Sequence, residues 1–146
     1  MEPLLISACL LGARCKYNGG HNALPPETLE ALRRRYRLVP ICPETAGGLP
    51  VPREPSERRA AGVYSRSGRD VTAAYQKGAA CARQLAQEEG CRLAILKERS
   101  PSCGVGSIYD GTFTGTQIPG NGVTVDALLD AGLTVYGESG VDTLLE

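Results

Sequence analysis

Four short aliphatic segments are spaced along the chain, and stretches with a helical spacing of apolar residues lie between them. Each aliphatic segment is continuous rather than alternating, which is typical of parallel strands that are covered on both faces of a sheet. We therefore expect buried strands at residues 4–7, 38–41, 93–96 and 133–136.

Three of the intervening stretches carry helix signals. We expect a helix opened by Pro25 and Pro26, a long helix at about 72–89 that ends at Gly90, and a third helix at about 124–130. The alternation of strand and helix predicts an α/β fold, with a mostly parallel, Rossmann-like sheet flanked by helices. We expect one domain over residues 1–146, since this length is usual for a single core.

Long segments rich in Gly and Pro follow the first three predicted strands, at residues 8–24, 43–64 and 97–122. The carboxyl ends of parallel strands meet at one edge of a sheet, and ligands bind there in open α/β folds. The functional site is therefore expected at this edge. Within the third segment, residues 108–114 predict a small hairpin with a tight turn at Asp110 and Gly111.

Charge and hydropathy exclude some classes of partner. Sixteen Lys and Arg residues balance sixteen Asp and Glu residues, which argues against an extended surface for large nucleic acids.

No apolar run approaches the roughly 20 residues that span a bilayer. The run that ends at Cys9 is similar to a lipoprotein signal, but it is short and follows the acidic Glu2. We expect a cytoplasmic protein, and the sequence leaves its oligomeric state open.

Six cysteines are candidates for chemistry, because in a reducing compartment such residues are more often metal-binding or catalytic than disulfide-bonded. Cys9, Cys42 and Cys103 each follow or end a predicted strand, so topology predicts that they converge at one edge of the sheet. Nearby glycines would let the backbone pass close to an inorganic group. These glycines are Gly47, Gly48, Gly104 and Gly106.

The other three cysteines are interpreted differently. Cys81 lies on a helix stripe and Cys91 enters a strand, so both are expected to fill the core as small hydrophobic residues. Cys15 shares the first loop with Cys9 and remains ambiguous: it either has a role in the site or only lines it.

Three thiolates allow two kinds of metal site. A closed zinc site needs four ligands, which His21, the only histidine, would complete. Alternatively, three thiolates hold a four-iron cluster and leave one iron without a protein ligand. That iron would be a soft Lewis acid for a substrate atom such as sulfur.

Several motifs together resemble the thiouracil desulfidase family over nearly the whole chain. The matching segments are SACLLG at 7–12, CKYNGG at 15–20, CPE at 42–44, GGL at 47–49, PR at 52–53, Lys97, SPSCG at 100–104, IYDGTF at 108–113, Gly120, and GVT at 122–124. Asn18 departs from the Asp that family members often carry. Asn-Gly and Asp-Gly both favour turns, so we expect an altered turn rather than altered chemistry.

The resemblance implies a [4Fe–4S] cluster held by Cys9, Cys42 and Cys103, with the fourth iron open. It also implies that Glu44 and Ser100 form the catalytic polar pair. The implied reaction removes sulfur from a thiolated pyrimidine without net redox change, giving a uracil-type product and sulfide. We expect the substrate to be a free base or a mononucleotide.

The residues taken singly allow less specific interpretations. Glu44 could instead be a solvated charge at the surface. Ser100 could instead be a turn residue before Pro101. Arg53 and Lys97 could bind a nucleotide phosphate or simply face solvent. The alternative function is a zinc-stabilised nucleotide-binding module without catalysis. A thiol-redox protein ranks last, because no Cys-x-x-Cys pair is present.

Overall fold

A four-stranded, fully parallel sheet forms the centre of the computed structural model, which describes residues 1–146. Its strands are β1 (Glu2–Ser7), β2 (Tyr36–Ile41), β5 (Leu93–Leu96) and β8 (Thr134–Gly137), in the order β2-β1-β5-β8. All four lie where the continuous aliphatic segments predict them. The expected parallel α/β sheet is confirmed.

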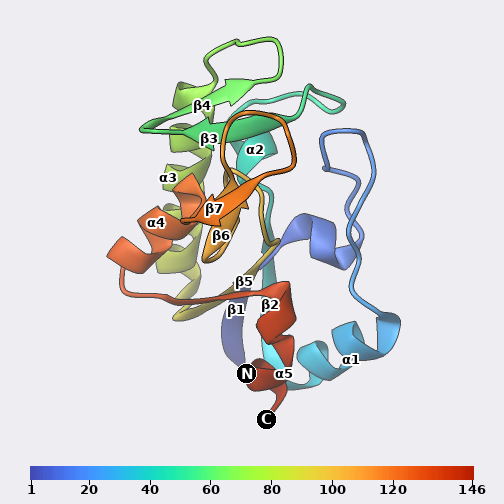
Figure 1. The fold of residues 1–146 in the computed structure, drawn as a ribbon. Coiled ribbons are helices and arrows are strands. Elements are labelled where there is room, and N and C mark those ends of the chain that lie inside the picture. Colours follow the sequence, from blue (N-terminus) through green and yellow to red (C-terminus); the bar gives the residue numbers. More distant parts are fainter.

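Helices cover both faces of this sheet (Figure 1). The long α3 (Thr72–Glu89) and α4 (Val123–Asp130) pack on one face. The shorter α1 (Pro26–Arg35) and α5 (Val141–Leu145) pack on the other. No helix combines the length and apolar character needed to cross a membrane.

The side chains of β1 show why its sequence does not alternate. Leu5 belongs to the core cluster beneath α3 and α4, whereas Leu4 and Ile6 belong to the cluster beneath α1 and α5. Successive side chains of a strand point to opposite faces, so a strand covered on both faces needs apolar residues at every position. All three of these side chains are fully buried.

Two small antiparallel hairpins lie beyond the sheet, at the end opposite the chain termini (Figure 1). The first pairs β3 (Ser56–Arg59) with β4 (Gly62–Ser65), and the sequence pattern does not predict it. The second pairs β6 (Ser107–Tyr109) with β7 (Gln117–Pro119).

The predicted hairpin turn at Asp110 and Gly111 is wrong. Tyr109 pairs with Gln117, so Asp110 begins a longer loop instead of a two-residue turn. The Asp110 carboxylate accepts hydrogen bonds from the Thr112 amide and hydroxyl, at 2.9 and 2.6 Å. Asp110 therefore forms a local turn within the loop through its side chain, and it does not form the turn that closes the hairpin.

The short helix α2 (Pro43–Ala46) docks directly on α3 through two glycines. A Cβ atom on Gly78 would lie 1.9 Å from the Pro43 carbonyl oxygen, and one on Gly47 would lie 2.0 Å from the Ala74 carbonyl oxygen. The absence of side chains therefore serves contact between two helices. This differs from the expectation that Gly47 makes room for an inorganic group.

The remaining helical turns are short 3₁₀ segments, η1 (Ala8–Leu11) and η2 (Glu138–Gly140). Each directly follows a strand of the main sheet, η1 after β1 and η2 after β8. The turn η1 carries Cys9, so the first cysteine leaves the sheet edge in a hydrogen-bonded turn rather than in an irregular loop.

Candidate active site

A cavity of about 520 Å³ lies at the carboxyl end of the parallel sheet, between the strand ends and the two hairpins. Cys9, Cys42 and Cys103 all line it, although they come from three distant parts of the chain. The structure thus brings together the three cysteines that topology predicts at one edge.

Local backbone structure fixes the first two cysteines. The Cys9 carbonyl accepts hydrogen bonds from the amides of Gly12 and Asn22, at 3.1 and 3.0 Å, which tie η1 to the end of the first loop. Cys42 is the N-cap of α2, and Pro43 occupies the first helical position, where its missing N–H costs no hydrogen bond. Because α2 is docked on α3, the position of Cys42 depends on that helix contact.

Cys103 is held from both sides. Its amide donates a hydrogen bond of 2.7 Å to the Ser100 hydroxyl. The first free amide of α4, at Val123, donates to the Pro101 carbonyl at 2.8 Å, and the next, at Thr124, donates to the Ser102 carbonyl at 2.9 Å. The start of α4 thereby braces the turn that presents Cys103.

Burial raises the pKa of three thiols that line this cavity, those of Cys9, Cys15 and Cys103. Desolvation raises the pKa of Cys103 to about 12, and desolvation followed by the neighbouring Cys42 raises the pKa of Cys15 to about 12. The pKa of Cys9 is also raised by burial, although a hydrogen bond from Asn22 opposes the shift. These three thiols therefore keep their protons near neutral pH in the metal-free protein. A metal displaces the protons when it binds, because a cysteine coordinates metal as the thiolate.

The donor set fits an iron–sulfur cluster better than one zinc ion. No three His, Cys, Asp or Glu side chains converge closely enough to hold a single metal ion, whose thiolate ligands stand about 3.8 Å apart. His21 is exposed, accepts a hydrogen bond from the Ala23 amide at Nδ1, and lies outside the cavity lining. In a four-iron cluster each thiolate binds a different iron, so the sulfur atoms are farther apart.

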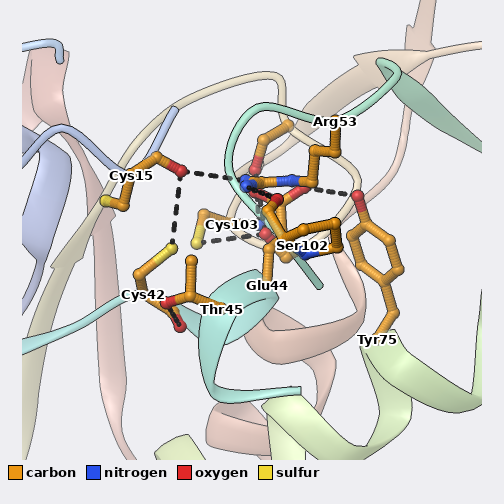
Figure 2. Close-up of polar contacts among 10 residues, drawn as sticks. Cys15, Cys42, Glu44, Thr45, Arg53, Tyr75, Ser102 and Cys103 are labelled. Carbon is orange, nitrogen blue, oxygen red and sulfur yellow. Dashed lines mark hydrogen bonds and ion pairs between the residues drawn. The ribbon is translucent and has the colours of Figure 1, made fainter. Parts of the chain in front are cut away.

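Glu44, in the first turn of α2, faces this cavity and is held by two buried side chains (Figure 2). Its Oε2 atom lies 3.2 Å from a guanidinium nitrogen of Arg53, and its Oε1 atom accepts a hydrogen bond from the Tyr75 hydroxyl. Tyr75 is 1% exposed. Burial, followed by the adjacent Glu44, raises the pKa of Tyr75, so the phenol keeps its proton and remains a donor.

Arg53 has a different partner from the one expected. Its side chain is 6% exposed and donates to the carbonyls of Pro50 and Cys15, at 3.1 and 2.9 Å, in addition to pairing with Glu44. It does not line the main cavity. Its charge is therefore paired with Glu44 inside the protein, so Arg53 neither faces solvent, one of the two alternatives for it, nor lines the main cavity, where the other alternative would have it meet a phosphate. The residues around Arg53 in the sequence do not indicate that its side chain is buried.

Lys97 lines the cavity as expected, but it is also paired. Its Nζ atom lies 2.7 Å from Glu138 and 3.3 Å from the Glu98 carbonyl oxygen. The cavity is also lined by three cations that belong to no ion pair of the structure, and the sequence did not single these out. They are Lys16, Arg66 and Arg99.

Ser100 lines the cavity and at the same time acts as a turn residue. Its hydroxyl accepts a hydrogen bond from the Cys103 amide and lies 3.3 Å from the Ser102 hydroxyl. Cys15 also lines the cavity, and its carbonyl oxygen lies 3.9 Å from the Cys42 sulfur (Figure 2).

Two cysteines lie outside the cavity lining, as expected of core residues. Cys91 is buried in the cluster beneath α3 and α4. Cys81 is half-buried on α3, with its thiol 3.9 Å from the Ala46 carbonyl oxygen.

Tyr75, which holds Glu44, is another residue that sequence reasoning missed. Its helical spacing with Ala79, Ala82 and Ala86 marks it as part of a buried stripe, which it is. A buried tyrosine needs a hydrogen-bond partner, and that rule was the one available signal that its hydroxyl reaches a polar site.

Fold and site together define a small α/β protein with an enzyme-like cavity at the carboxyl edge of its sheet, lined by thiols and by carboxylates that include Glu44. The 2-thiouracil desulfurase family matches residues 4–140, and the chain belongs to this family. A protein of Bacillus subtilis (strain 168), YbbK, described as uncharacterized, is 41% identical over 152 residues, covering 97% of this chain and 99% of YbbK.

A solved structure described as the [4Fe–4S]-dependent thiouracil desulfidase TudS is similar throughout. It is 43% identical to this chain with a TM-score of 0.94, and the match covers 99% of this chain and 95% of TudS. At this TM-score and coverage the two proteins share the α/β fold.

Proposed function

We propose that this protein hydrolytically removes sulfur from a thiolated pyrimidine, at a [4Fe–4S] cluster held by Cys9, Cys42 and Cys103. The observation that carries the proposal is that these three cysteines and Glu44 line one cavity. Family membership and the similarity to TudS support it independently.

Held by Cys9, Cys42 and Cys103, the cluster would supply a soft Lewis acid that could polarise the thiocarbonyl bond. The overall change is balanced by water alone. The water oxygen bonds to the ring carbon, the carbon–sulfur bond breaks, and the two protons of water leave with the sulfur as hydrogen sulfide. No electron is gained or lost, so the protein needs no external reductant.

Glu44 is the residue proposed to take the proton from the attacking water. A general base must be oriented within hydrogen-bond reach of that proton. Tyr75 and Arg53 hold the two carboxylate oxygens of Glu44, which restricts the side chain to one orientation at the cavity. Ser100 is proposed to relay the proton or to orient the substrate, because its hydroxyl lies on the cavity beside Cys103.

The substrate is proposed to be a thiopyrimidine base or its 5′-mononucleotide. The cavity of about 520 Å³ has room for either. Lys16, Arg66 and Arg99 are the cations free to meet a phosphate, and Lys97 adds a paired one. The zero net charge of the chain supports a small substrate over a large nucleic acid.

The test begins with protein reconstituted anaerobically with iron and sulfide. Wild type should bind about four irons and four acid-labile sulfides per chain. It should release sulfide from at least one member of a panel of 2- and 4-thiouracil, their nucleosides and their 5′-monophosphates. Cys9→Ala, Cys42→Ala and Cys103→Ala should each lose iron and activity.

Cys81→Ala is the matched control, since Cys81 does not line the cavity, and it should retain both properties. A colourless protein with one zinc per chain and no sulfide release from any substrate would overturn the proposal in favour of a binding module.

A further inference from the structure

Three residues other than glycine adopt a left-handed backbone: Ala60, Arg99 and Phe113. This conformation is costly for a residue with a side chain, and it persists only where the surrounding structure imposes it. Ala60 lies in the turn between β3 and β4, a usual place for it. Arg99 and Phe113, with large side chains, both line the cavity.

The backbone at Phe113, with a φ of 58°, is imposed by contacts from outside its own loop. The Glu57 carboxylate, on β3, accepts hydrogen bonds from the amides of Gly111 and Phe113, at 3.0 and 3.1 Å. Gly111 is pressed against β3, where an added Cβ would lie 2.7 Å from the Arg59 Cβ atom. Contacts from β3, a strand of the other hairpin, thus hold this loop in one conformation.

The chain uses glycine at many left-handed positions, including Gly115 two residues further on. A glycine at position 113 would remove the energetic cost of the left-handed backbone. The presence of Phe there indicates that the aromatic ring itself is needed. The ring does not lie in either core cluster, and it lines the cavity. The Arg66 guanidinium lies 5.7 Å from the ring centroid, which places a cation beside the aromatic wall.

We propose that Phe113 is a specificity-determining residue whose ring stacks on the pyrimidine ring of the substrate. The proposal rests on the function proposed above and deepens it. A flat aromatic base gains most from a flat partner that is already in place, because no side-chain freedom is lost on binding. The Glu57 clamp provides that rigidity, while the cysteines lie in the same cavity.

The test uses cluster-loaded protein and two readouts. Calorimetry measures the binding of uracil and uridine 5′-monophosphate, which lack the reacting sulfur, and steady-state kinetics measure sulfide release from the best thiopyrimidine. In Phe113→Leu both the Kd and the KM should rise about ten-fold while kcat stays within about three-fold, as expected for loss of one stacking contact. Phe113→Tyr should restore wild-type binding.

Ile118→Ala is the control, because Ile118 is an exposed apolar residue on β7 outside the cavity lining. It should change neither readout. The inference is overturned if wild type is active and Phe113→Leu binds and turns over normally, or if the leucine variant loses iron in proportion to binding and tyrosine does not restore it. Absence of sulfide release by wild type itself would instead overturn the proposed function.

Discussion

The Tyr75 hydroxyl donates a hydrogen bond to the Glu44 carboxylate, although the two residues lie on different helices and 31 positions apart. Arg53 contacts the other oxygen of the same carboxylate. The Glu44 side chain is 19% exposed, and with two fixed partners it has little rotational freedom. The proposed base is therefore positioned before any substrate arrives.

Removing this hydrogen bond should affect turnover more than binding. In Tyr75→Phe, we expect kcat to fall about 10- to 100-fold with KM and iron content near wild type, because a hydrogen bond to a charged group contributes about 1.5–3 kcal/mol. Steady-state sulfide release and iron analysis check this. Tyr64→Phe, in the first hairpin, is the control and should match wild type. An unchanged kcat in Tyr75→Phe would show that Glu44 does not need this partner.

Replacing the proposed base itself should have a larger effect. Glu44→Gln retains the shape of the side chain, so cluster content should persist while kcat falls by about 10²–10⁴, the usual contribution of a general base. The matched control is Glu54→Gln, since Glu54 is an exposed carboxylate that binds Ser67 outside the main cavity. Near-normal turnover in Glu44→Gln would remove Glu44 from the mechanism.

The contact between α2 and α3 should be intolerant of a single methyl group. A Cβ on Gly78 would overlap the Pro43 carbonyl, so Gly78→Ala must push α2 away. We expect a loss of about 1–3 kcal/mol in the free energy of unfolding, together with lower iron content, because Cys42 caps α2.

A change of the opposite kind on the same helix is the control for Gly78→Ala. Ala80 is exposed on α3, and Ala80→Gly should cost about 1 kcal/mol through helix propensity alone, with iron content unchanged. Urea unfolding and iron analysis distinguish the two variants. Full iron content in Gly78→Ala would contradict a role of this contact in placing Cys42.

The raised pKa of Cys103 predicts how the stability of the metal-free protein depends on pH. The folded-state pKa of about 12 lies above the ordinary value of 9.0, so between these values the folded state binds more protons than the unfolded state. Its contribution is complete below about pH 9 and is lost as the pH rises toward 12. The melting temperature should therefore fall with increasing pH in this window.

Cys103→Ala should make that decline shallower, whereas Cys81→Ala should leave it as in wild type. Thermal unfolding from pH 8 to 10.5 measures both. Parallel pH profiles for wild type and Cys103→Ala would contradict the assignment of the effect to this thiol.

Sequence patterns were most informative where a requirement is local. The continuous apolar run of β1 reflects burial on both faces, and the bounds of α3 follow from its apolar spacing and from Gly90, which ends it in a left-handed conformation. The hairpin turn at Asp110 failed because a dipeptide that favours a tight turn also favours an Asx turn within a longer loop, and distant contacts select between them.

The candidate site divides in the same way. Cys9, Cys42 and Cys103 could be grouped from the expected parallel topology alone, because it brings the carboxyl ends of the strands to one edge whatever their order. The partner of Arg53 could not be predicted, since nothing in its neighbourhood indicates that its side chain turns inward to Glu44.

By itself, the sequence determined the parallel sheet, its main helices and the set of cysteines at one edge, since periodicity and chain order suffice for these. Only the tertiary structure decided which charged side chains form ion pairs, how α2 packs on α3, and which aromatic rings line the cavity. These features depend on contacts between segments far apart in the chain, whose distances no local pattern encodes.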